Sequence, residues 1–120
     1  MAKTFEELSV WQESRALVRD VYRISESGDF RRDLALRVQI RRAVISIPSN
    51  IAEGFERGGG REFRQFVTVA KGSCGEVRTQ LYILRDIGHV ESDAADPLIE
   101  RIGRMLGALR RALIPAGRRA

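Results

Sequence analysis

The 120-residue sequence predicts an all-α protein, an antiparallel up-down-up-down four-helix bundle whose second helix is kinked at Pro48. Three observations lead to this fold class. Apolar residues recur at three- and four-residue steps along almost the whole chain, which is the period of an amphipathic helix. Turn-forming residues divide the chain into segments joined by connections of about four to eight residues, which suits antiparallel neighbours. The one strand-like run, 43–47, has no partner strand.

The first helix is expected over about 6–25. Thr4 and Glu7 match a capping box, in which Thr4 accepts a hydrogen bond from the helix start and Glu7 reaches back. Gly28 is a plausible left-handed cap after the helix. The apolar face is expected to consist of Leu8, Trp11, Val18, Val21 and Tyr22, widened by Val10, Leu17 and Ile24.

The second helix is expected over about 33–56, with Asp33 as its N-cap. Pro48 lies inside it, lacks an N–H, and would clash with the carbonyl of Val44, so we expect a kink or a short break there. The neighbours that can satisfy the freed backbone groups are Ser46, Ser49 and Asn50. The core stripe of this helix is expected to be Leu36, Ile40, Ala43, Val44, Ile47, Ile51 and Phe55.

The third helix is expected over about 61–87, after a glycine turn at 58–60 and before a cap at Gly88. That turn is not a phosphate-binding P-loop, because it follows no strand and is not followed by Lys-Ser or Lys-Thr. Gly72 and Gly75 lie mid-helix, which indicates that another backbone passes close by. A heptad seam typical of a bundle runs through Phe63, Val67, Ala70, Cys74, Val77, Leu81 and Leu84.

The fourth helix is expected to start at Asp96, an N-cap followed by Pro97 at the first helical position, and to end near Leu113. Its apolar stripe is expected to be Leu98, Ile102, Met105, Leu109 and Ala112. One domain is therefore predicted over 1–120, with a core of about 5–113 and a frayed basic tail at 114–120.

The second helix carries more apolar surface than one bundle needs. If the helix is roughly continuous, a second apolar stripe lies across the axis from the core stripe, and a polar stripe separates the two. That second stripe consists of Leu34, Val38, Ile45 and Ala52. On the third helix, Val69, Ile83 and Ile87 lie off the main seam in a similar way. We expect a homo-oligomer that buries the second stripe, unless the kink rotates Ala52 and dissolves it.

The charge and cysteine content limit the function classes. Lys and Arg number 21 against 16 acids, a net charge of +5, and 19 of the 21 are Arg, which suits phosphate binding or records a GC-rich genome. The longest charge-free stretch, 43–52, has ten residues, whereas a membrane-spanning helix needs about 20. With a single cysteine and no signal-peptide pattern, the chain is expected in a reducing cytoplasm, without an internal disulfide.

Catalysis is not expected. Cys74 and His89 are the only thiol and imidazole, and an intact helix would separate them by roughly 22 Å. The Glu-x-x-His pairs of ferritin-like metal sites do not occur. We therefore expect no cofactor, no metal and no small-molecule substrate, with an enzyme using Asn50 and Glu53 as the alternative.

Three parts of the sequence carry a family resemblance. They are residues 39–54, which include Ser46-Ile-Pro-Ser-Asn-Ile-Ala-Glu-Gly54, residues 5–12, and, in the third helix, Gly72-Ser73, Glu76 and Gln80-Leu81. The chain resembles the bacterial four-helix-bundle family named for the 23S rRNA intervening-sequence protein. The resemblance implies a small bundle that assembles into homopentamers, and a relative that accompanies a retroelement reverse transcriptase and binds nucleic acid. The residues matching the signature are Gln39, Arg41, Arg42, Ser46, Pro48, Ser49, Asn50, Glu53 and Gly54. Departures occur at 58–60 and at Cys74–Gly75.

The sequence thus predicts a non-enzymatic oligomeric interaction protein that contacts RNA, or an RNA-bound protein, through an arginine-rich surface. The candidate contacts, around the kink and the following turn, are Arg41, Arg42, Arg57, Arg61 and Arg64. Each of these has an ordinary structural alternative; Arg57, for example, is placed to pair with Glu53 four residues earlier. The alternative function is a purely structural homo-oligomer that binds protein and has no nucleic-acid role.

Overall fold

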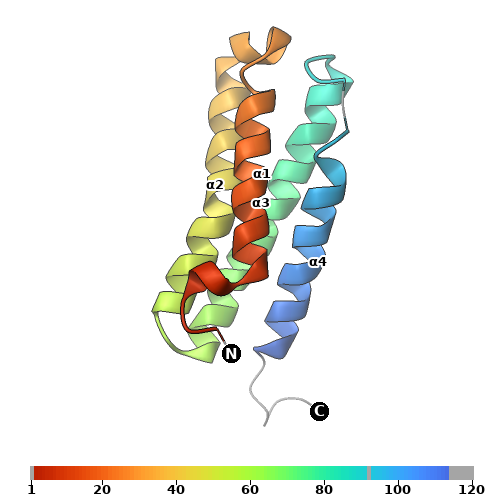
Figure 1. Cartoon of the computed structure of the whole chain (residues 1–120). Helices are drawn as coiled ribbons and strands as arrows, with labels where there is room; N and C mark the ends of the chain where they lie inside the picture. Colours follow the sequence, from red (N-terminus) through yellow and green to blue (C-terminus); the bar gives the residue numbers. More distant parts are fainter. Residues whose placement is uncertain (1, 92, 114–120) are drawn as a thin grey trace.

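Four α-helices make up most of the computed structural model, which describes residues 2–91 and 93–113 (Figure 1). They are α1 (Ser9–Ile24), α2 (Leu34–Glu56), α3 (Gly60–Asp86) and α4 (Asp96–Ala112), with short 3-10 turns at Phe5–Glu7 and Gly28–Arg32. Within these described residues there is no β-strand. The predicted all-α four-helix fold is confirmed, whereas the expected tail at 114–120 lies outside the described residues.

Consecutive helices lie side by side, with their connections at alternate ends (Figure 1). Ser46 of α2 hydrogen-bonds Ser73 of α3, and Gly54, further along α2, lies beside Phe63, which is earlier in α3. The same reversal joins α3 to α4, where Arg78 meets Glu100 and Lys71 meets Gly107. These pairings place α3 antiparallel to both of its neighbours.

The core contains the faces of α2 and α3 that their spacing predicts. On α2, Ile40, Val44, Ile47 and Ile51 have no exposed surface, and Leu36 and Phe55 are partly buried at the two ends. On α3, the heptad seam from Val67 to Leu84 is buried, and Phe63 is partly buried. Burial of each such aliphatic side chain contributes about 1.5–3 kcal/mol, so these two stripes supply much of the driving force for folding.

The buried face of α1 is rotated from the predicted one. Its centre follows Val10, Ser14, Leu17 and Val21, whereas Leu8, Trp11, Val18 and Tyr22 lie at its edges. The prediction included Val21 and took Val10 and Leu17 only as a widening of the face, and it did not assign the polar Ser14 to the core. Its hydroxyl donates to the carbonyl of Val10 at 2.6 Å, which satisfies the only polar group that the side chain brings into the core.

The buried face of α4 is rotated in the same way. Ile99, Ile102, Leu106 and Gly107 are buried, whereas Leu98, Met105 and Leu109 are only partly buried and the predicted Ala112 is exposed. The four-three spacing from Leu98 is genuine but marks the edge of the packed face. In a short helix with apolar residues at adjacent positions, spacing alone does not decide which of two neighbouring stripes is central.

The start of α2 and the end of α3 follow local capping rules. The Asp33 carboxylate accepts a hydrogen bond from Leu36 N at 3.2 Å, which confirms it as the N-cap of α2. Gly88 has a φ of 78°, and His89 N donates to Leu84 O at 2.9 Å, which is the Schellman cap expected for α3. The predicted N-cap of α4 was wrong by one residue, because Asp96 is already helical and its carboxylate pairs with an arginine of α3.

Pro48 lies within a single unbroken α2, so the expected break is absent, while a kink stays a prediction. The nearby polar side chains hydrogen-bond the helix backbone: Ser46 Oγ donates to Ala43 O at 2.9 Å, and Asn50 Nδ2 donates to Ser46 O at 2.7 Å. Ser49 is exposed. The polar residues around Pro48 therefore hold the surrounding helical turn in place.

Candidate functional site

The outer α2 stripe, defined as Leu34, Val38, Ile45 and Ala52, is largely uncovered in the single chain. Leu34 is 66% exposed, Val38 48% and Ile45 41%, whereas Ala52 is half-buried. Ile45 and Ala52 line the same surface groove, so the stripe runs past Pro48 and does not dissolve there. The side chains predicted for an oligomer interface are thus grouped on one side of α2 and do not pack into its own core.

This stripe continues into an apolar groove between α1 and α2, of about 440 Å³. Phe5 of the first 3-10 turn and Trp11 and Val18 of α1 line one side, with Arg15 and Arg19 at the same side, and Pro48 lines the α2 side. Phe5 and Trp11 meet edge to face at a ring-centroid distance of 5.1 Å, which holds the indole in place. Aromatic and aliphatic groups in a shallow, uncovered groove are typical of a protein interaction surface.

Further exposed apolar side chains, together called the outer α3 patch, are Ile83 and Ile87, one turn apart at the end of α3, and Val69, which lies roughly 21 Å before Ile83 along the helix. All three side chains are exposed, as their position off the heptad seam predicts. On α2 itself, polar residues lie between the outer α2 stripe and the core stripe of the same helix, which is the arrangement expected of a helix with two packed sides.

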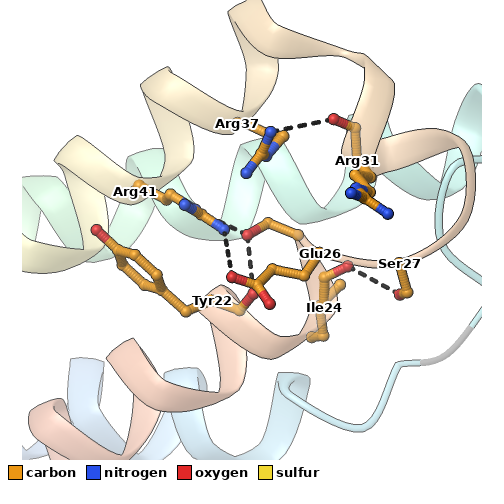
Figure 2. A network of polar contacts seen from close by, with 8 residues as sticks. Tyr22, Ile24, Glu26, Ser27, Arg31, Arg37 and Arg41 are labelled. Atoms are coloured by element: carbon orange, nitrogen blue, oxygen red, sulfur yellow. Dashed lines mark hydrogen bonds and ion pairs between the residues drawn. The ribbon is translucent and has the colours of Figure 1, made fainter.

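Arg41, a predicted nucleic-acid contact, is engaged within the chain (Figure 2). Its Nε donates to Ser25 Oγ at 2.8 Å, its guanidinium lies 4.2 Å from the ring centroid of Tyr22, and its Nη2 lies 3.6 Å from a Glu26 carboxylate oxygen. The side chain is only 21% exposed. Arg41 therefore joins the end of α1 to α2. This is the kind of structural role expected from the sequence as the alternative to nucleic-acid contact.

The other predicted arginines do not form one cluster. Arg42 and Arg57 are 15 residues apart on a continuous helix, or roughly 22 Å. Arg57 bonds Glu53 at 2.9 Å and Glu62 at 3.4 Å, and the Glu53 contact raises the pKa of its guanidinium above the ordinary value. Arg42 and Arg61 are exposed and have no ion pair within the described residues, so their positive charges face solvent without a partner.

Arg64, the last of the five, is partly buried at the start of α3, and its Nε has no hydrogen-bond partner within the described part of the chain. Among the remaining signature residues, Gln39 is exposed and Gly54 is buried. A Cβ on Gly54 would lie 2.7 Å from Phe66 Cβ and 3.3 Å from Phe63 Cα. Gly54 therefore permits the close approach of α2 to α3.

That close approach was predicted at the wrong glycines. Gly72 and Gly75 have no atom within 4 Å of a hypothetical Cβ, apart from their own helix. Both lie on parts of α3 that no neighbouring helix covers in the single chain. The glycine that sits under a neighbouring helix is Gly54, which is identified only when the facing aromatic residues are placed.

The residues with catalytic potential lie apart. Cys74 is 4% exposed within α3, and burial raises the pKa of its thiol to about 11, so it is protonated at neutral pH. His89 follows the end of α3 and lies 3.1 Å from Asp33, where it braces the N-cap of α2. In the described residues, His, Cys, Asp and Glu side chains form no group of three suited to a metal ion.

A basic groove between α3 and α4 was missed by the sequence reasoning. It has a volume of about 670 Å³ and its lining includes Lys71, Arg104 and Arg111, together with Gly103 and Gly107. The signal was present in α3, where basic residues recur every seven positions at 64, 71, 78 and 85. Of these four residues only Arg64 was singled out from the sequence, because the apolar seam of the helix was followed and not the basic repeat beside it.

Across the described residues, none of the helices combines the length and apolar character that a bilayer-spanning helix requires.

Comparison with known proteins agrees with this fold. No curated protein matches the chain significantly. The family model described as 23S rRNA-intervening sequence protein matches residues 6–111, which is most of the chain and includes all four helices. The chain therefore belongs to the 23S rRNA-intervening sequence protein family.

Proposed function

We propose that this protein is a non-enzymatic, self-assembling helical bundle in which the outer α2 stripe and the adjoining α1–α2 groove are buried against a second copy. The observation that carries the proposal is the exposure of Leu34, Val38 and Ile45 on a helix whose opposite side already fills the core. A helix in a monomeric bundle needs only one apolar side. The family resemblance favours five copies in the assembly.

Self-association would bury substantial apolar surface. Complete burial of an aliphatic side chain contributes about 1.5–3 kcal/mol, so covering three half-exposed ones contributes roughly 3 kcal/mol per protomer. The aromatic rings of Phe5 and Trp11 lie in the same groove and add to this contribution. The outer α3 patch extends the apolar area that an assembly can cover.

Nucleic-acid contact forms the second part of the proposal, in which the assembly presents arginines to RNA or to an RNA-bound protein. It is supported by the net charge of +5 and by the unpaired, exposed side chains of Arg42 and Arg61. Reversible phosphate contacts of this kind act through charge and are weakened by salt. We place the protein in the cytoplasm, where the single unpaired Cys74 stays reduced.

A binding role is favoured over catalysis by the contacts of the polar stripe. The side-chain amide of Asn50 is used on its own helix backbone, and the carboxylate of Glu53 is paired with Arg57. The enzyme alternative requires both groups to face a substrate. Neither a cofactor nor a small-molecule substrate is part of the proposal.

The self-assembly is tested with Ile45→Asn and a matched control, Tyr82→Asn, which replaces an equally accessible apolar side chain on α3. Light scattering at micromolar concentration should give a multiple of the 13.5 kDa chain for the wild type and Tyr82→Asn. Ile45→Asn should shift the mass toward the monomer while circular dichroism shows unchanged helix content. A monomeric wild type, or equal dissociation of both variants, would refute the interface.

A salt titration of binding to structured RNA tests the second part. The wild type should bind at low salt, and the affinity should fall steeply as the salt concentration rises. If the assembled protein binds no RNA at low salt, the purely structural homo-oligomer replaces the RNA-contacting one.

A further inference from the structure

We propose that the groove between α3 and α4 binds the phosphodiester backbone of single-stranded nucleic acid. This inference rests on the nucleic-acid part of the proposed function and assigns it to a surface that the sequence did not indicate. The groove is the α3–α4 surface lined by Lys71, Cys74, Gly75, Arg78, Ile99, Glu100, Gly103, Arg104, Gly107 and Arg111.

The depth of this groove comes from its glycines. Gly75 on α3 and Gly103 on α4 leave open space where side chains would otherwise fill the gap between the helices. At the third glycine, Gly107, a hypothetical Cβ would lie 3.7 Å from Lys71 Cε and 3.5 Å from Arg111 Nη1. The ends of these two cationic side chains therefore converge on the same point of the groove.

The charges of the groove are compensated at one end only. Arg78 lies 3.6 Å from Glu100, and beyond the groove Arg85 lies 3.1 Å from Asp96. At the other end, Lys71, Arg104 and Arg111 form no ion pair with any described residue. One carboxylate among five lining charges leaves this surface strongly positive, which concentrates an anionic ligand.

Helix capping does not account for these cations. Arg110 and Arg111 lie in the last turn of α4, where positive charge stabilises the helix dipole. Lys71 lies in the middle of α3, and Arg104 lies in the middle of α4. Neither position interacts appreciably with a helix end, and both side chains remain next to the groove.

The shape and lining of the groove favour a strand backbone as the ligand. The three lining cations that form no ion pair with a described residue, Lys71, Arg104 and Arg111, can neutralise about three phosphates of a strand, at one phosphate per cation. Among the described residues, no aromatic side chain lines the groove, so these residues offer no platform for stacking bases. Recognition should therefore depend on phosphate charge and not on base sequence.

The test compares two variants that each lose three positive charges. The groove variant carries Lys71→Gln, Arg104→Gln and Arg111→Gln. The control carries Arg23→Gln, Arg31→Gln and Arg32→Gln, which removes three exposed arginines that lie outside the groove and outside the candidate RNA contacts. Binding of a short labelled oligouridylate and of the matching oligothymidylate is followed by fluorescence anisotropy across a salt series. Circular dichroism checks that both variants keep the wild-type helix content.

For the wild type, three neutralised phosphates give a slope of log K against log salt of about −2 from the groove, at 0.7 per single-strand phosphate. The groove variant should lose that contribution and bind more than tenfold more weakly at low salt, while the control keeps it. The two oligonucleotides should bind within about tenfold of each other, because cations alone do not sense the 2′-hydroxyl.

Three results would overturn the groove assignment while leaving nucleic-acid binding intact: a groove variant that binds like the wild type, equal losses in both variants, or a hundredfold preference for one sugar. If the wild type binds neither oligonucleotide nor structured RNA, the nucleic-acid part of the proposed function itself is wrong.

Discussion

Replacing Gly54 with alanine is expected to destabilise the bundle, although alanine favours helices. The added Cβ would lie 2.7 Å from Phe66 Cβ, 3.0 Å from Phe63 Cδ1 and 3.3 Å from Phe63 Cα. One of these neighbours is backbone, so a side-chain rotation cannot relieve the contact and α2 must move away from α3. Since both helices supply the centre of the core, that displacement also loosens the surrounding aliphatic packing.

The expected magnitude follows from two opposing effects. Overpacking a close contact costs typically 1–3 kcal/mol, and the backbone neighbour places this site at about 3 kcal/mol. Alanine in place of glycine raises the unfolding free energy by about 1 kcal/mol through its higher helix propensity. The net loss for Gly54→Ala is therefore about 2 kcal/mol. Gly72→Ala is the matched control, because its Cβ meets nothing within 4 Å and should stabilise by about 1 kcal/mol.

The assay is urea unfolding followed by circular dichroism, at one fixed protein concentration because self-association changes the apparent stability. Gly54→Ala should unfold at a lower urea concentration than the wild type, and Gly72→Ala at a higher one. If Gly54→Ala is as stable as Gly72→Ala, the α2–α3 contact at Gly54 is not close and the packing argument is refuted.

Three further changes probe the local contacts. Asp33→Ala should lower the unfolding free energy by about 1 kcal/mol through loss of the α2 N-cap, whereas Asp33→Asn, an equally good cap, should recover most of it; equal losses by urea unfolding would contradict the cap. Burial raises the thiol pKa of Cys74 from an ordinary 9.0 to about 11, because the folded protein disfavours the charged thiolate. The contribution of the protonated thiol to the unfolding free energy is therefore fully present below pH 9 and is lost as the pH rises toward 11. Unfolding free energies from urea curves across that range should fall further for the wild type than for Cys74→Ala, by at most about 2.7 kcal/mol, and an equal fall for both proteins would contradict this. Hydrogen bonds from the backbone N–H groups of Thr4 and Lys3 lower the pKa of Glu7, so its contribution to stability is present above its ordinary pKa of 4.5 and is lost as the pH falls through the lower folded value; an NMR titration of Glu7 at or above 4.5 would contradict the capping contact.

The fold follows from the sequence where spacing and turn chemistry agree. The stripes of α2 and α3 combine strict three-four steps with clear caps at Asp33 and Gly88, so both their existence and their buried faces were predicted correctly. On α1 and α4, adjacent apolar residues give two stripes of similar strength. The choice between them depends on where neighbouring helices lie, which spacing within one helix does not contain.

The candidate surfaces also differ in how well the sequence predicts them. The accessible side chains of Leu34, Val38 and Ile45 were predicted because an apolar stripe opposite a core stripe is visible on a helical wheel. The predicted arginine cluster was less accurate, because ion pairs such as that of Arg57 and the packing of Arg41 on Tyr22 depend on side-chain positions. The basic α3–α4 groove is formed by residues of two helices. The basic residues of either helix do not indicate a groove until the two helices are aligned side by side.

The most direct test of the account is whether a second copy covers the outer α2 stripe. In a Cys74→Ala background, Ile45→Cys places one thiol where the isolated chain is 41% exposed, and its alkylation rate is measured over a range of protein concentrations. The account predicts slow alkylation at concentrations where the protein is assembled and fast alkylation on dilution. A rate equal to that of a freely accessible thiol at every concentration, in a protein of monomeric mass, would contradict it.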